Sequence, residues 1–368
     1  MTVRDVAKIL EAWAPPAIAW ERDNPGLQVG DPGARVKGIL VSLDLTPAVV
    51  SEARRRGANL IVSHHPLLFR PLRSVDVGSG AGSVVAALVR HRISAYAAHT
   101  NLDFVRGGTS FVLAQRLGLT GVRFLSPLAG WERKVVTFVP EADADRVMEA
   151  MASAGAGRIG EYERCSFRSA GTGTFRGSAR SRPAVGRALR LERVPEVRLE
   201  MVVPATSLEG VLGALRAAHP YEEPAVDVHG VEGGAAGFGM GAVGELAEGV
   251  APGAFLRMIR SRLGVARLRT SAETGEVVRR VAVCGGSGAD LLPEAIRAGA
   301  QMFVTADVRY HTFQEAAGRI VIVDAGHHET EFPVVAAVAG RLRAACAGKR
   351  GAPFVAAAAS ETNPVRHR

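Results

Sequence analysis

Cysteine is scarce in this chain, and long apolar runs are missing. The 368 residues include three cysteines, Cys165, Cys284 and Cys346, which lie far apart and form no Cys-x-x-Cys pair. We therefore expect neither a disulfide framework nor a thiolate zinc site. No apolar run reaches the roughly 18 residues that a membrane helix needs, and the amphipathic, acid-containing N-terminal segment is unlike a signal peptide. The sequence predicts a cytoplasmic protein that is not associated with a membrane.

Lysine is also scarce, although the chain is basic. The net charge is +9 and the pI is near 10.1, but lysine occurs only at positions 8, 37, 134 and 349. The arginines are spread along the chain, apart from short clusters such as Arg54-Arg55-Arg56. A nucleic-acid site usually gathers its basic residues on one face, so we do not expect nucleic acid as the partner. The remaining composition, 47% hydrophobic and 22% charged, is typical of a globular protein, and the length predicts two or three domains.

A strand–helix–strand pattern occurs twice. Residues 36–46 and 59–65 read as strands around a helix over 46–58, with Thr46 as N-cap, Pro47 at the first helical position and Gly57 as C-cap. Residues 278–286, 290–300 and 301–307 repeat the pattern, and segment 51–65 matches 293–307 in register, with His65 on Asp307. We predict an α/β core of two related modules whose strand ends meet in one cleft.

A segment of different composition separates the two modules. Strands are expected at 134–140, 197–205 and 222–231, and helices at 141–156 and 207–220, with a Gly/Ser/Arg-rich loop at 171–186. This order predicts an inserted ferredoxin-like α+β domain. The expected domains are residues 1–129 as the first half of the core, 130–235 as the insert and 236–368 as the second half.

Histidines and carboxylates follow four of the predicted strands. A neighbouring His-His pair is by itself more common as a surface or core feature than as a ligand pair, but here further polar residues end other apolar runs. The four segments supply, in order, His64 and His65; His99 and Asp103; Asp307 and His311; and His327, His328, Glu329 and Glu331. Imidazole and carboxylate together suit zinc, iron or manganese.

Spacing narrows the choice of ligands. If a helix begins at Gly326, His327 and Glu331 are four residues apart and share a face, whereas His328 points elsewhere. Both His64 and His65 can act as metal ligands only if two metals lie close together, or if the strand has ended and the backbone turns. Pro66 favours a turn here, because proline cannot continue a central strand. Asp103 can bridge two cations, an arrangement that activates water.

These motifs resemble a known family. DNPGLQVGDP (23–32), VSHHPLLF (62–69), HTNLD (99–103), TADVRYH (305–311), GHHETE (326–331) and SETNP (360–364) are similar to the dinuclear-metal-centre hexameric proteins. That family is also known as the type-2 homologues of GTP cyclohydrolase I and is related to the yeast NGG-interacting factor three. The middle segment, with GAGRIGEYERCSF (155–167) and HPYEEPAVDV (219–228), resembles the family's PII-like and cation-tolerance-like insert.

The resemblance implies a ligand set and an assembly. Two divalent metal ions per chain are held by His64, His65, Asp103, His327 and Glu331. Asp103 and Glu331 bridge the ions, His99 and His311 line the same cleft, and the chains form a toroidal homohexamer. This chain departs from the pattern at His328, where an aromatic residue is usual, and at Ala306, where glycine is usual. The first departure leaves open whether His328 replaces or assists His327.

Three functions compete at this point. A metal-dependent hydrolase of the GTP cyclohydrolase kind would act on a small molecule such as a nucleotide, open the purine ring and release formate, with His99 or His311 as proton shuttle. A non-catalytic metal-binding or regulatory scaffold would use the insert as a sensor. A nucleic-acid binder rests on charge alone. No Walker-type phosphate loop is present, so nucleotide binding would be of another kind.

Overall fold

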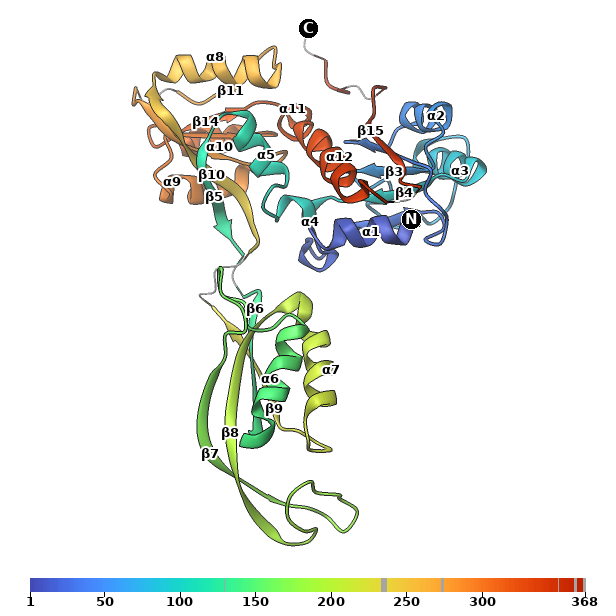
Figure 1. The fold of residues 1–368 in the computed structure, drawn as a ribbon. Helices are drawn as coiled ribbons and strands as arrows, with labels where there is room; N and C mark the ends of the chain where they lie inside the picture. Colours follow the sequence, from blue (N-terminus) through green and yellow to red (C-terminus); the bar gives the residue numbers. More distant parts are fainter. Residues whose placement is uncertain (129, 233–236, 273–274, 350, 361–362, 367–368) are drawn as a thin grey trace. The chain divides into compact units, whose positions relative to one another are not determined.

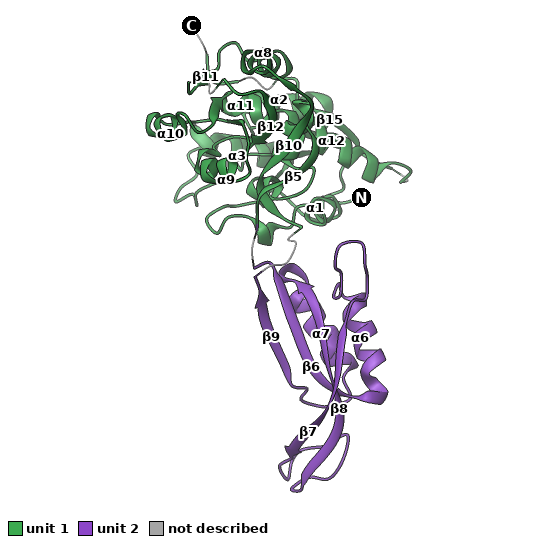
Figure 2. Cartoon of the chain, turned by 90° about the vertical axis from the view of Figure 1, so that its left-hand side faces the viewer, with its two compact units in different colours: residues 1–127, 237–368 green, residues 128–236 purple. Residues whose placement is uncertain are grey.

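The chain folds into two compact units, which Figure 2 colours separately. The structure is a computed structural model that describes residues 1–128, 130–232, 237–272, 275–349, 351–360 and 363–366. Unit 1 comprises Met1–Pro127 and Gly237–Arg368, and unit 2 comprises Leu128–Ala236. Residues 233–236, at the predicted boundary between the insert and the second half of the core, lie outside the described residues, as do Glu361 and Thr362 of the SETNP motif.

The first sheet of unit 1 has five short strands. They are β1 (Gly26–Val29), β2 (Gly38–Ser42), β3 (Leu60–Ser63), β4 (Ser94–Ala97) and β15 (Phe354–Ala357). The spatial order is β1-β4-β3-β2-β15, with β1 antiparallel at one edge and the other neighbours parallel. Every residue of β2, β3 and β4 is buried, because helices cover both faces of a parallel sheet.

Helices on the two faces of this sheet come from distant parts of the chain. They are α1 (Val3–Glu11), α2 (Pro47–Arg56), α3 (Gly80–His91) and α12 (Pro333–Cys346). Helices α2 and α3 pack on one face, and α12 packs against β2 and β15 on the other (Figure 1). The predicted caps of α2 are confirmed: Thr46 accepts a hydrogen bond from the Val49 amide, and Gly57 has φ +72°.

The second sheet of unit 1 has six strands. They are β5 (Thr120–Pro127), β10 (Gly239–Val250), β11 (Arg269–Thr270), β12 (Val278–Val283), β13 (Met302–Thr305) and β14 (Val321–Asp324). The order is β11-β14-β13-β12-β10-β5; β12, β13 and β14 are parallel, and the other pairs are antiparallel. Its helices are α5 (Thr109–Arg116), α8 (Pro252–Leu263), α9 (Leu292–Arg297) and α10 (Tyr310–Ala316). Helices α5 and α8 cover one face, and α9 and α10 the other.

The two halves of the chain exchange elements between these sheets. Strand β5 comes from the first half of the sequence but pairs with β10 in the second sheet. Helix α12 and strand β15 come from the second half but complete the first sheet. A simple division of the core into an N-terminal and a C-terminal half therefore misses this exchange, which ties the two sheets together.

Unit 2 is a four-stranded antiparallel sheet with two helices. The elements are β6 (Glu132–Pro140), α6 (Ala144–Ser153), β7 (Phe167–Arg176), β8 (Leu191–Pro204), α7 (Leu208–Ala218) and β9 (Val226–Val231). The strand order is β7-β8-β6-β9, and α6 and α7 pack together over one face of the sheet. The loop predicted over 171–186 is wrong in its first part, because β7 runs to Arg176 and pairs with β8 along its whole length.

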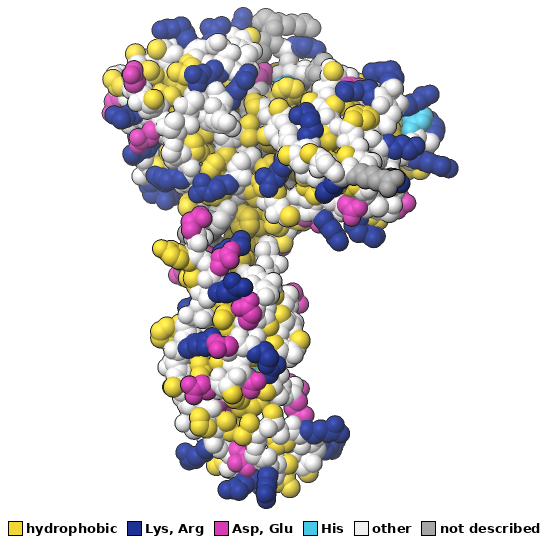
Figure 3. Space-filling view, viewed as in Figure 1, with side chains coloured by type: hydrophobic (Ala, Val, Ile, Leu, Met, Phe, Trp, Pro, Cys, Tyr) yellow, Lys and Arg dark blue, Asp and Glu magenta, His cyan; other side chains and the backbone are white. Residues whose placement is uncertain are grey.

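Figure 3 shows where basic side chains lie on one face of the molecule. On the face in Figure 3 the lysines and arginines lie at separate positions on both units, with acidic and apolar side chains between them. Within the described part of the chain, no helix has both the length and the apolar character needed to cross a bilayer.

Candidate metal centre

Residues from both sheets of unit 1 meet in one cluster. His64 and His65 directly follow β3, and His99 precedes the short helix α4 (Thr100–Asp103) after β4. Helix α11 (His327–Glu331) follows β14 of the second sheet. The ligand atoms of His64, His65 and His99 lie within 4.8 Å of one another, as do those of His65, His327 and Glu331.

The carboxylate of Glu331 faces two sets of imidazoles. Its Oε2 lies 2.9 Å from His65 Nε2 and 3.0 Å from His327 Nε2. Its Oε1 lies 3.8 Å from the Nε2 of His64. The predicted i,i+4 pairing of His327 and Glu331 on one helix is confirmed by α11. One carboxylate thus has an oxygen for each side of the cluster, as a group that bridges two cations must.

The other ring nitrogen of each histidine is already held by an acceptor. Because backbone carbonyls and carboxylates only accept hydrogen bonds, each Nδ1 carries a proton, and Nε2 is the ring nitrogen that faces the cluster and can bind a metal ion once the ring is neutral. The Nδ1 contacts are His64 with Ala98 O (2.8 Å), His65 with Asp44 (2.8 Å), His99 with Asp23 (2.8 Å) and His327 with Asp307 (2.7 Å). Metal-binding histidines are usually oriented in this way.

Two buried atoms of the cluster have no hydrogen-bond partner among the described residues. These are His64 Nε2 and Asp103 Oδ1, and they lie 3.7 Å apart. That separation is too long for a hydrogen bond, and leaving buried polar atoms unpaired costs about 1–3 kcal/mol each. A cation coordinated by both atoms removes this cost. The residues present therefore fit the implied metal ions.

The protonation of the cluster reflects a strong negative field. Burial opposes the charged form of His65, but hydrogen bonds to Asp44 and Glu331 outweigh it and raise the pKa of His65 to about 10. The hydrogen bond to Glu331 and the nearby charges likewise raise the pKa of His327 to about 9, against burial. Burial would raise the pKa of Glu331, but hydrogen bonds from the histidines hold it well below its ordinary value. Such a field attracts cations, whether protons or metal ions.

The backbone is strained beside His327. Asp307, which holds the Nδ1 of this ring, has φ +54°, a left-handed conformation that is rare for residues other than glycine. Gly286, in the loop after β12, also has a positive φ of +63°. A Cβ on Gly286 would come within 2.0 Å of Glu331 Oε1, so only glycine leaves room for the Glu331 carboxylate.

Two histidines of the predicted segments, His311 and His328, do not join the cluster around Glu331. His311 is exposed on α10, where its Nδ1 lies 3.2 Å from Gln314 Oε1 and its ring contacts Tyr310. It thus packs against its own helix and not against the other histidines. His328 stacks flat on Phe332, with ring centroids 4.9 Å apart, while His327 makes the contacts with Glu331. The structure therefore brings His327, not its neighbour, into the cluster.

Three supporting residues were outside the predicted site set. Asp44 and Asp23 orient His65 and His99, and Gly286 makes room for Glu331. Asp44 follows the buried strand β2, and this position at a strand end could have identified it as a site residue from the sequence. Asp23 lies in the DNPG turn, and only the folded chain brings it to His99 and Thr100.

A family model covers almost the whole chain and decides its relationship. The model is described as Duf34/NIF3 (NGG1p interacting factor 3), and it matches residues 1–364. The chain belongs to the Duf34/NIF3 family. This agrees with the resemblance inferred from the histidine and carboxylate motifs.

Curated relatives in the Duf34/NIF3 family carry the name "GTP cyclohydrolase 1 type 2 homolog". One from Halalkalibacterium halodurans is 37% identical over 325 residues, which is 88% of this chain and 87% of that protein. One from Mycobacterium tuberculosis is 38% identical over 351 residues, 93% of this chain and 92% of that protein.

A solved structure shares the fold of the whole chain. The Bacillus cereus protein related to NIF3 is 36% identical, has a TM-score of 0.84 and covers 100% of this chain and 99% of its own. A Staphylococcus aureus protein is 27% identical, with a TM-score of 0.81 over 100% and 99% of the two chains. The mixed α/β fold with several sheets is therefore that of NIF3-related structures.

Proposed function

We propose that this protein binds two divalent metal ions and acts as a metal-dependent hydrolase of the GTP cyclohydrolase 1 type 2 kind. The observation that carries the proposal is the orientation of the histidines: each Nδ1 is held by an acceptor, and the Nε2 atoms of His64, His65 and His327 face Glu331. The names of the curated relatives favour this reaction class, but they say only "homolog".

In this proposal five residues hold the ions. They are His64, His65, Asp103, His327 and Glu331. Zinc, iron or manganese there would supply a water molecule of lowered pKa and would polarise the bond under attack. The reaction expected is attack at C8 of a purine nucleotide, followed by ring opening and release of formate.

The chain's own proton carrier in this proposal is His99. Asp23 holds its Nδ1, and the Asp23 carboxylate also accepts hydrogen bonds from the amide and hydroxyl of Thr100. Nε2 is therefore the nitrogen left to exchange a proton with substrate or water. His311, the other residue predicted for this role, lies on the exposed side of α10 and contacts Gln314, so His99 is the proposed carrier.

The test is formate release. Purified protein loaded separately with zinc, iron or manganese is incubated with GTP, and formate is measured. We expect release with at least one metal and a large loss in His99→Ala, with His311→Ala as the matched control that keeps the wild-type rate. No formate with any of the three metals would exclude GTP as substrate.

A second candidate is a non-catalytic, hexameric regulatory scaffold, and the separate unit 2 favours it. Pro127 pairs with Gly239 at the point where the chain leaves and re-enters unit 1, so a short Asn-Gly turn can replace the insert. If hydrolysis survives in this deletion variant, the protein is an enzyme with an added module. If the full-length protein shows no hydrolysis, and the deletion variant differs from it only in losing the hexameric assembly, the results favour the non-catalytic scaffold. Light scattering measures the assembly in both forms.

The proposal also includes a ferredoxin-like fold for unit 2 and two related strand–helix–strand modules in unit 1. The order β7-β8-β6-β9 with antiparallel neighbours supports a ferredoxin-like reading of unit 2. The elements α2–β3 and α9–β13 support the two related modules, since His65 and Asp307 follow the matching strands. A structure of each unit expressed alone would test whether they are independent folding units.

A further inference from the structure

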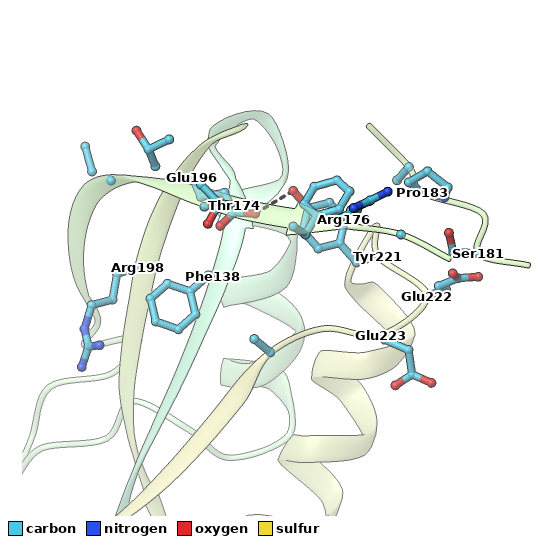
Figure 4. Close-up of a pocket in the computed structure, with 18 of the residues that line it drawn as sticks. Phe138, Thr174, Arg176, Ser181, Pro183, Glu196, Arg198, Tyr221, Glu222 and Glu223 are labelled. Carbon is cyan, nitrogen blue, oxygen red and sulfur yellow. Dashed lines mark hydrogen bonds between the residues drawn. The ribbon is translucent and has the colours of Figure 1, made fainter. Parts of the chain in front are cut away.

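A cavity of about 620 Å³ lies within unit 2. Its walls are β7 from Ser169 to its end, parts of β6 and β8, and the segment between α7 and β9 (Figure 4). This volume is in the range of small-molecule sites, which are about 300–1,000 Å³. The metal cluster is built from residues of unit 1, and none of them lines this cavity.

The cavity wall combines three aromatic side chains with many small residues. Phe138, Phe175 and Tyr221 line it, and the rings of Phe175 and Tyr221 have centroids 6.3 Å apart. Gly171 and Gly173 contribute no side chains on the β7 side. Such a lining favours a ligand with a flat apolar body, which can lie against the rings.

One buried carboxylate faces this apolar space. Glu196 is only 9% exposed, and its Oε1 accepts a hydrogen bond of 2.7 Å from the Tyr221 hydroxyl. A Cβ on Gly173 would come within 2.0 Å of Glu196 Oε2, so the glycine provides the space in which this oxygen lies. Among the residues that the structure describes, no donor contacts Oε2, and no basic side chain lies within 4 Å of the carboxylate.

The two basic residues of the wall do not pair with Glu196, and Arg198 lies over the ring of Phe138, with Cζ 5.7 Å from its centroid. Arg198 is paired with Glu200 at 2.7 Å, and Arg176 donates through Nε to the Leu189 carbonyl. Glu196 therefore has only a neutral partner, and a buried charge without a counter-charge is costly. A ligand that brings a positive charge to Oε2 removes this cost.

We propose that this cavity binds a flat organic cation, such as an amidinium or a protonated amino-heterocycle, whose N–H groups donate to Glu196 and whose ring lies against the aromatic wall. A planar cation matches a carboxylate through two parallel hydrogen bonds, and aromatic faces attract cations. A divalent metal ion fits less well, because no group of three ligand atoms was found around Glu196 in the described chain.

Benzamidine and benzamide provide a matched pair of probes. They have the same ring and nearly the same shape, but only benzamidine is charged at pH 7. Isothermal titration of full-length protein should give saturable binding of benzamidine and at least about tenfold weaker binding of benzamide, because the neutral amide leaves the carboxylate unpaired. Equal affinities, or no saturable binding of benzamidine, would overturn the proposal.

Two substitutions locate the site. Glu196→Gln keeps the shape and the acceptor for Tyr221 but removes the charge, and we expect it to weaken benzamidine binding at least about tenfold. Glu149→Gln on α6 makes the same change in net charge at an exposed ion pair with Arg164 and should leave binding unchanged. Unchanged affinity in Glu196→Gln, or equal losses in both variants, would contradict this location.

A third variant keeps the test valid if Glu196→Gln does not fold. Ala184 lines the cavity from the loop after β7 and is exposed. Ala184→Trp adds bulk to this wall without touching the core of unit 2, so benzamidine binding should be lost while the melting temperature stays at the wild-type value. Retained binding in this variant would place the ligand elsewhere.

Discussion

Glu331 on α11 and His65 after β3 touch across 266 positions of the sequence, with Oε2 and Nε2 2.9 Å apart. The two residues follow strands of different sheets, so their contact exists only when both sheets of unit 1 are formed and docked. A metal ion bound at this contact would therefore stabilise unit 1 as a whole.

The metal content of the protein should depend on Glu331. Glu331→Gln keeps the size of the side chain but removes the charge that both sets of imidazoles face. Wild type should carry about two metals per chain, and the variant fewer, by elemental analysis after gel filtration. His311→Ala is the control and should keep the wild-type content. Equal metal in Glu331→Gln and wild type would refute the site.

Asp307 should matter for metal affinity but little for stability. Asp307→Gly removes the carboxylate that orients His327 and also removes the strain of a left-handed Asp. We expect about 10–100-fold weaker metal binding. In the metal-free protein the relief of strain offsets the lost contact with His327, so the free energy of unfolding should change by no more than about 1 kcal/mol in thermal unfolding.

Arg92→Gly is the matched control for this substitution. Arg92 ends α3 with φ +52°, so glycine relieves the same kind of strain there without removing a carboxylate from the cluster. Its metal affinity should equal that of wild type. A parallel loss in both variants would mean that backbone conformation, not the Asp307 carboxylate, controls binding.

Metal binding should release protons near neutral pH. In the metal-free protein the pKa of His65 is raised to about 10 and that of His327 to about 9, so both rings are charged at pH 7. Metal coordination needs the neutral rings, so about two protons leave per chain, and affinity rises as pH increases from 7 toward 9. Titration calorimetry in buffers of different ionisation enthalpy measures this number. An affinity independent of pH over this range would disprove the interpretation.

Glu52 should stabilise the C-terminal segment of the described chain. Its carboxylate, on α2, accepts hydrogen bonds from the amides of Ala359 and Ser360, from the Ser360 hydroxyl and from Arg56. Burial raises the pKa of Glu52, but these hydrogen bonds outweigh it and lower the pKa to about 2. The resulting stability is present above the unfolded value near 4.5 and is lost as pH falls through about 2.

Glu52→Gln tests this contribution. We expect it to lower the free energy of unfolding at pH 7 by about 1–3 kcal/mol and to flatten the fall in stability between pH 5 and 2, measured by urea unfolding. Glu315→Gln, on the exposed side of α10, should do neither. A pH dependence that remains as steep as in wild type would assign the acid sensitivity to other carboxylates.

Much of the metal cluster could be predicted because its signals are local. A polar residue placed directly after an apolar run marks a strand end, and His64, His65 and His99 follow β3 or β4 in this way, while Asp103 ends the short helix after β4. The pairing of His327 with Glu331 needs only the period of a helix. His311 also follows the pattern, but the turn of α10 directs it to the surface, which spacing from a strand cannot reveal.

The sequence alone determined the residue types that can bind metal, the caps of α2 and the positions of most strands, because each depends on neighbours within about one turn or one strand. Only the tertiary structure decided how β5, α12 and β15 cross between the sheets, which carboxylate holds each imidazole, and that β7 is a strand. These features depend on contacts between residues far apart in the chain. Their free energy comes from burial and from pairing of polar groups after the sheets have docked, and no local pattern records it.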